Sequence, residues 1–224
     1  MATTVVKIGD YDVGVLKFEQ PPESMKRKQV QELMLPKYGG GRSPFIQLPS
    51  ITLDAYGVPP KGAWFKGDYQ RALLKIPLDR EMLTFSKKFD DRFRSEAMKM
   101  ELLASRCAKY VYTPIVRTPE DASKPPYMKL NLFTDYHTHE IQTPVIVKDT
   151  TNSYVLECRS IDSFSAAVRF RSIITCIIVP SKLWIQAAGT SDPKYGIAFK
   201  LVKIKTEYPT NSGIPNTSAH FIED

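Results

Sequence analysis

The chain is poor in cysteine: Cys107, Cys158 and Cys176 are widely spaced, and no CxxC pair occurs. An odd number at wide spacing argues against a disulfide framework and against a cysteine-rich zinc site. Cys176 lies in the apolar run RSIITCIIVP and is expected to be a buried small hydrophobe. This usage of cysteine favours a reducing, intracellular compartment.

Long hydrophobic runs are also missing. The longest is Ile173–Pro180, interrupted by Thr175, far short of the ~20 residues that a membrane span needs. The first residues, MATTVVKIGDYDVG, carry polar and acidic side chains where a secretory signal needs an apolar core. We therefore expect a soluble protein that does not bind membranes directly.

Motifs for nucleotide or acyl chemistry are absent. No GxxxxGK[ST], GxGxxG or GxSxG occurs. His137 and His139 form an HTH tripeptide that could ligate a metal from one strand face, but no third ligand is evident nearby. The adjacent Asp90 and Asp91 are interpreted as salt-bridged surface residues, because neighbouring helical positions diverge by about 100°. We expect no enzyme activity, no metal and no cofactor.

What the sequence does have is positive charge. Its 31 Lys/Arg exceed its 24 Asp/Glu, giving a formal net charge of +7 and a pI of about 9.2. Most of the excess lies in residues 1–112. Such a balance favours polyanionic partners through counterion release, without choosing between DNA, RNA and an acidic membrane.

Hydrophobic periodicity predicts a mainly β (α+β) chain. Strand-like stretches rich in Val, Ile, Thr and aromatics fill both ends of the sequence. A short helix is predicted at Ser24–Leu35, and one long amphipathic helix at about 79–109, opened by Asp79 and carrying a stripe of phenylalanines. This pattern suggests an OB-type β-barrel with elaborating strands, forming a single domain over residues 1–210, and a flexible tail at 211–224.

Three segments interleave rings with cations, as binding of a single strand requires. They are KGAWFKGDYQRALLK (61–75), Val168–Thr175, in which Arg169 and Arg171 are expected to share a strand face, and Leu183–Lys205. The residues expected to bind nucleic acid are Trp64, Lys66, Arg71, Lys129, Arg169, Arg171, Trp184, Tyr195, Lys200, Lys203 and Lys205. An outer basic strip is expected from Lys87, Lys88, Arg92 and Arg94.

Two stretches resemble the single-stranded DNA-binding proteins of nucleocytoplasmic large DNA viruses, whose fold resembles the OB barrels of phage replication proteins. They are YTPIVRTPEDASKPPYMKLNL (112–132) and the pair RSIITCIIVPSKLWI and KYGIAFKLVKIK within Val168–Lys205. The loop Ala187–Pro193 is longer than this pattern, and the tail ends in only two acids, Glu223 and Asp224. The resemblance implies coating of exposed strands during viral replication, recombination or repair, in the host cytoplasm or nucleus.

The sequence therefore predicts a non-enzymatic protein that binds single-stranded DNA without reading its sequence. RNA stays open as a ligand, because stacking does not distinguish the sugars. Self-association and contacts with replication proteins also stay open. The rival interpretation is a virion scaffold protein with a β-sandwich and no nucleic-acid site.

Overall fold

The computed structural model describes residues 4–21, 31–62, 65, 67–148 and 153–208. The predicted tail, 211–224, lies outside these ranges. The strands are β1 (Val5–Lys7), β2 (Leu16–Glu19), β3 (Gln31–Tyr38), β4 (Phe45–Gln47), β5 (Ile51–Thr52), β6 (Leu73–Pro77), β7 (Val111–Tyr112), β8 (Tyr127–Leu132), β9 (Val145–Lys148), β10 (Ser153–Leu156), β11 (Ile173–Gln186) and β12 (Lys194–Glu207). The helices are η1 (Ile8–Asp10), η2 (Val13–Val15), α1 (Asp68–Arg71), α2 (Arg80–Arg94), α3 (Glu96–Leu103), η4 (Ala104–Lys109) and α4 (Ile161–Ala167).

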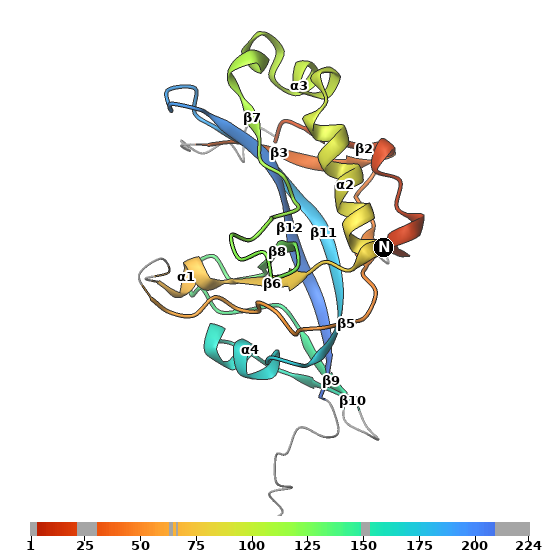
Figure 1. Ribbon diagram of the computed structural model, residues 1–224, viewed down its shortest axis with the longest axis vertical. Coiled ribbons are helices and arrows are strands. Elements are labelled where there is room, and N and C mark those ends of the chain that lie inside the picture. The colour runs from red at the N-terminus through yellow and green to blue at the C-terminus, as the bar shows by residue number, and fades with distance from the viewer. Residues whose placement is uncertain (1–3, 22–30, 63–64, 66, 149–152, 209–224) are drawn as a thin grey trace, which may run out of the picture.

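A long antiparallel hairpin, β11–β12, forms the axis of a twelve-stranded mixed sheet (Figure 1). On the side away from β12, β11 pairs antiparallel with β3, β4 and β5. On the side away from β11, β12 pairs in parallel with β7, β8 and β9. The main path runs β1-β4-β11-β12-β8-β6. The described strands thus form an open mixed sheet: the chain is mainly β, as predicted, but its sheet is not closed into a barrel.

The hydrophobic core lies between one face of this sheet and α2. Asp79 caps α2 by accepting a hydrogen bond from Met82 N at 2.8 Å, as the sequence predicts. Phe85, Phe89 and Phe93 are buried, and the Phe89 ring lies 5.3 Å from that of Phe199 on β12. In Figure 1 α2 lies along one side of the hairpin.

The predicted single helix over 79–109 is wrong beyond residue 94. Ser95 adopts an extended conformation with ψ of 146°, and its Oγ caps α3 by accepting from Met98 N. A short α3 and the 3-10 helix η4 follow. The apolar stripe is interrupted after Phe93, since Ala97 and Met100 are exposed, and Leu103 is buried again. A serine that caps a new helix overrides the weak periodicity after Phe93.

Two further expectations are corrected. Residues 31–35, predicted as the end of a helix, belong to β3, because pairing with β11 and β2 overrides helical propensity. Asp90 is not a surface residue: its carboxylate is buried and accepts from Tyr112 Oη, Ile115 N and Val116 N. Burial raises the pKa of Asp90, and these three hydrogen bonds oppose the shift.

All three cysteines are free thiols, and Cys176 is buried, as expected. Among the described helices, none is both long and apolar enough to span a bilayer.

Candidate nucleic-acid interface

The register of the β11–β12 hairpin separates its two faces. Ile178 pairs with Leu201 and Cys176 with Ile204, and these four side chains are buried. The alternating positions on β12 therefore project from the opposite face. A register shift between Ile177 and Ile178 leaves Val202 without a partner on β11. This shift brings Lys203 and Lys205 to the face of Lys200, whereas uninterrupted alternation would place them on the core face.

Lysines line this second face. Lys200, Lys203 and Lys205 project from β12, and Lys182 projects from β11, opposite Ala198. Same-face positions along a strand recur about every 6.6 Å, so the lysines form a row. Burial, and next the nearby charge of Lys182, lower the pKa of Lys200.

The row continues across the sheet onto β8 and β6. Lys200 pairs with Asn131 on β8, so Lys129 lies on the same face, and Lys129 pairs with Lys75 on β6. Arg117 reaches this group through an isolated bridge to Tyr127. Burial, followed by the charges of Arg117 and Lys75, lowers the pKa of Lys129. We call this surface the basic face; its core set is Lys75, Arg117, Lys129, Lys182, Lys200 and Lys203.

Among the described residues, these six cations lack an acidic partner. Within the described part of the chain, none of them lies within ion-pair distance of a carboxylate. Lys205, at the end of the row, differs, because Glu207 pairs with it at 3.0 Å and with Lys148 at 3.1 Å. Lys75 and Lys129 lie directly opposite each other, and like charges in that position destabilise a sheet, so this pair weakens the folded state unless an anion binds.

Aromatic rings lie among these cations. Trp184 pairs with Gly196, where a Cβ would come within 2.9 Å of the indole, so the half-buried Trp184 ring lies over the glycine. Lys200 Nζ is 4.3 Å from the centre of the Phe133 ring. Lys75 Nζ lies 5.5 Å from the Tyr127 ring, which in turn contacts Tyr56 at 4.6 Å. Rings and cations together are the two components that a single strand requires.

Of the residues expected from the sequence, the structure brings five together on this face: Lys129, Trp184, Lys200, Lys203 and Lys205. Lys75 belongs to the expected segment 61–75, whereas Arg117, Lys182, Tyr127 and Phe133 were not expected. Alternation within β6, β8 and β11 indicates which side chains share a face, but only the pairing of strands places these residues beside Lys200.

Tyr195, expected to bind nucleic acid, does not belong to the basic face. Its side chain is fully buried, and its hydroxyl donates a hydrogen bond to the carbonyl of Phe93 on α2. The alternation that places Tyr195, Ile197, Phe199 and Leu201 on one face is confirmed, and that face is the core. A ring there cannot stack on a base.

Arg71, also expected to bind nucleic acid, does not belong to the basic face either. Its guanidinium is buried and donates to Pro59 O at 2.9 Å, to Asp68 at 3.0 Å and to Asp162 at 2.9 Å. These contacts join α1 to α4 and use the donors that a phosphate would need. Arg71 is a structural residue.

Arg169 and Arg171 do not share a strand face, because β11 begins only at Ile173. They lie in the turn after α4, where Arg171 has a φ of 67°. The Arg169 guanidinium lies 3.8 Å from the centre of the Tyr208 ring, while Arg171 is exposed. The two side chains therefore act separately from the basic face.

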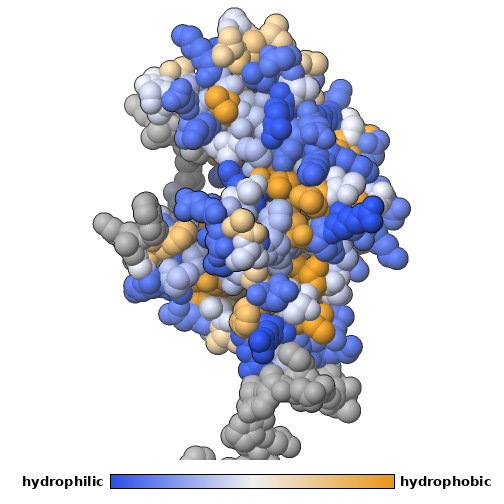
Figure 2. Space-filling model, viewed as in Figure 1, coloured by the Kyte–Doolittle hydropathy of each residue, from blue (hydrophilic) through white to orange (hydrophobic). Residues whose placement is uncertain are grey.

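The expected outer strip is on the other side of the sheet. Lys87, Lys88 and Arg94 are exposed on α2 and Arg92 is half-buried, and α2 packs on the core face. Figure 2 shows hydrophilic side chains over this helix. The strip is thus not an extension of the basic face. Trp64 and Lys66 lie outside the described residues.

The histidine segment forms a polar turn. Asp135 accepts from the backbone amides of His137 and Thr138 at 2.8 and 2.9 Å, and His139 has a φ of 60°. Those two amides lower the pKa of Asp135. In the described residues, no group of three His, Cys, Asp or Glu side chains is placed to hold a metal.

No family model matches the chain, and no curated protein matches it significantly.

Proposed function

We propose that this protein binds single-stranded DNA along the basic face, without reading its sequence and without catalysing a reaction. One observation carries the proposal: six cations with no ion-pair partner among the described residues share, with several aromatic rings, the sheet face that α2 does not cover. A face of this kind costs stability in the free protein, and a bound polyanion removes that cost.

The mechanism has two parts. Lys and Arg side chains neutralise backbone phosphates and release counterions, which supplies affinity that falls with salt. Rings such as Trp184 then stack on bases, contributing about 1–3 kcal/mol per base. Phosphates and base faces are common to all sequences, so binding of this kind tolerates any sequence. In a duplex the base faces are already stacked, so the rings favour unpaired strands.

The dimensions of the face fit a short strand. Trp184 lies nine residues from Thr175, the partner of Lys205, which corresponds to roughly 30 Å of strand. Single-strand sites on OB folds cover about 4–16 nucleotides. We expect an occluded site near the lower end of that range.

The resemblance in residues 112–132 and 168–205 supports a role in viral DNA replication, recombination or repair, at a replication site in the host cytoplasm or nucleus. We further propose that the open sheet is an elaborated and opened relative of the OB barrel. An experimental structure with bound oligonucleotide would test both the fold and the face that is used.

The test of function is a fluorescence titration with single-stranded oligo-dT, single-stranded RNA of matched length, and duplex DNA at low and moderate salt. We expect tighter binding to the single strands than to the duplex, with a steep loss of affinity as salt rises. Equal affinity for duplex and single strand would indicate a general polyanion binder. Absence of binding at low salt would refute the proposal.

A scaffold role is the second candidate, and β10 favours it. Along the described chain β10 pairs only with β9, and all four of its residues are exposed, including Tyr154, Val155 and Leu156. Uncharged, apolar edge strands are prone to pair with other chains. Assembly into large particles that is insensitive to nucleic acid would support this role.

A further inference from the structure

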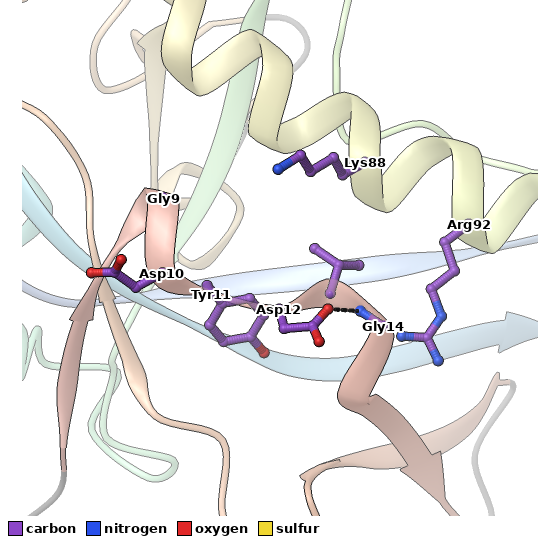
Figure 3. A pocket seen from close by; sticks show the side chains of 8 residues that line it. Gly9, Asp10, Tyr11, Asp12, Gly14, Lys88 and Arg92 are labelled. Carbon is purple, nitrogen blue, oxygen red and sulfur yellow. Dashed lines mark hydrogen bonds between the residues drawn. The ribbon is translucent and has the colours of Figure 1, made fainter.

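A hollow on the core side of the sheet, opposite the basic face, is lined by Arg92, whose Nη1 has no hydrogen-bond partner among the described residues. It lies between α2 and the segment that forms η1 and η2, with a cavity volume of about 490 Å³. Figure 3 shows Lys88 and Arg92 extending from α2 on one side and Asp12 on the other, with the Asp10 carboxylate turned away from both cations. An adjoining hollow of about 370 Å³ shares Gly9 and Lys88. Small-molecule sites have volumes of about 300–1,000 Å³.

The cations of this hollow are placed to act together. Lys88 and Arg92 are four residues apart on α2 and therefore lie on one helix face, one turn apart. Arg92 Nη1 is buried and has no hydrogen-bond partner within the described chain. A buried donor left unsatisfied costs about 1–3 kcal/mol, so this nitrogen requires an acceptor.

The carboxylates near the hollow do not supply an acceptor for Arg92 Nη1. Within the described residues, neither Asp10 nor Asp12 forms an ion pair with Lys88 or Arg92. Asp12 Oδ1 accepts a hydrogen bond from Gly14 N at 2.8 Å, which shapes the turn. Its other oxygen, Oδ2, is free to accept from a hydroxyl group of a ligand. A Cβ on Gly9 would meet nothing within 4 Å, so this wall is open.

The geometry points to a site for a nucleotide 5′-phosphate. The phosphate contacts Arg92 and Lys88, where a guanidinium offers two donors in a fork that matches phosphate oxygens. In a free nucleotide a sugar hydroxyl donates to Asp12 across the hollow. The first residue of a 5′-phosphorylated DNA strand has no free sugar hydroxyl and makes only the phosphate contacts. The phosphate comes either from a free nucleotide or from the phosphorylated 5′ end of a strand. This site does not depend on the basic face, because α2 packs on the opposite side of the sheet.

The test is a titration of ¹⁵N-labelled protein with adenosine 5′-monophosphate, following the amide signals of Gly9 and Gly14. We expect both signals to shift with the nucleotide and not with adenosine. A 5′-phosphorylated oligo-dT that shifts them where its unphosphorylated form does not would identify strand ends as a source. If neither the nucleotide nor the phosphorylated strand shifts them at millimolar concentration, the site does not exist.

Variants identify the contacts. Loss of one charge-assisted hydrogen bond corresponds to a five- to tenfold weaker affinity at about 1–1.4 kcal/mol, and we expect this for Lys88→Met. Arg92→Lys keeps the charge but loses the fork and should weaken binding similarly. Lys87→Met is the matched control, because Lys87 is exposed on α2 and does not line the hollow. Unchanged affinity in both Lys88→Met and Arg92→Lys, with unchanged thermal midpoints, would overturn the assignment.

The same variants separate this site from the basic face. Lys88→Met should leave the affinity for oligo-dT unchanged, and Lys200→Met should leave the affinity for the nucleotide unchanged. Each proposal can therefore fail while the other holds.

Discussion

Replacing Lys200 by methionine should weaken DNA binding and stabilise the protein at the same time. Lys200 lies on the basic face with no ion-pair partner in the described chain, and burial and Lys182 lower its pKa. A methionine removes the repulsion but keeps a side chain that packs on Phe133, since thioethers contact rings favourably. An ordinary structural lysine would not give these two opposite effects.

The magnitudes follow from the geometry. With six cations each neutralising one phosphate, log K should fall with log salt at a slope of about −4, at roughly −0.7 per phosphate for single strands. The variant should bring the slope to about −3.5 and weaken binding about fivefold at 0.1 M salt. Removing the diagonal like-charge pair of Lys200 and Lys182 should add about 0.2–1 kcal/mol of stability, or about 0.4–4 °C in the midpoint of thermal unfolding.

Fluorescence anisotropy with labelled oligo-dT at several salt concentrations measures the slope, and thermal unfolding without DNA measures the stability. Lys87→Met makes the same charge change on α2, on the other side of the sheet, and should leave the slope unaltered. Equal slopes for Lys200→Met and Lys87→Met would refute the assignment of the face. A destabilised Lys200→Met would refute the argument from repulsion.

Three further predictions follow from the same arrangement. Trp184→Leu should reduce oligo-dT affinity by about 1–3 kcal/mol, the usual value of one stacked base, with little change in salt slope; anisotropy checks this, and a change in slope without loss of affinity would contradict it. Tyr195→Phe should cost about 1 kcal/mol of stability through its lost hydrogen bond to Phe93 and leave DNA binding intact, as urea unfolding and anisotropy would reveal; weaker binding would return Tyr195 to the interface. Because Lys129 and Lys200 have pKa values below the ordinary lysine value, their charged forms are disfavoured in the fold. Their destabilising effect is present at neutral pH and disappears as pH rises through the lowered values, while affinity for DNA falls over the same range. A pH titration of binding at constant salt should show this loss before about pH 10.4, where ordinary lysines titrate, and a flat profile would argue against these two contacts.

The helix and the core strands show how far local patterns extend. Asp79 and the stripe of Phe85, Phe89 and Phe93 predict the start and the buried face of α2, and both are confirmed. The end of the helix was not predictable from periodicity, because Ser95 offers a local cap that competes with continuation. Helix α4 was missed, since its seven residues, IDSFSAA, are too few to show a period.

For the candidate site, residue type was a weaker guide than position. Arg71 and Tyr195 fit the expected chemistry, yet one makes a buried network with Asp162, 91 residues away, and the other supports α2. No sequence pattern marked Lys182 or Arg117 as a binding residue. The sheet brings Lys182 near Lys200 and Arg117 near Lys129. Burial and partners decide whether a cation is available to a phosphate, and neither is local in sequence.

The sequence by itself determined the excess of positive charge, the predominance of strands and the two-residue alternation that places Tyr195, Ile197, Phe199 and Leu201 on one face of β12. Those properties depend on composition and on near neighbours along the chain. Only the tertiary structure decided which strands lie side by side, that the sheet stays open, and that α2 covers the apolar face. Strand pairing joins residues far apart in the chain, so the gathering of lysines from β6, β8, β11 and β12 on one surface arises only when the sheet forms.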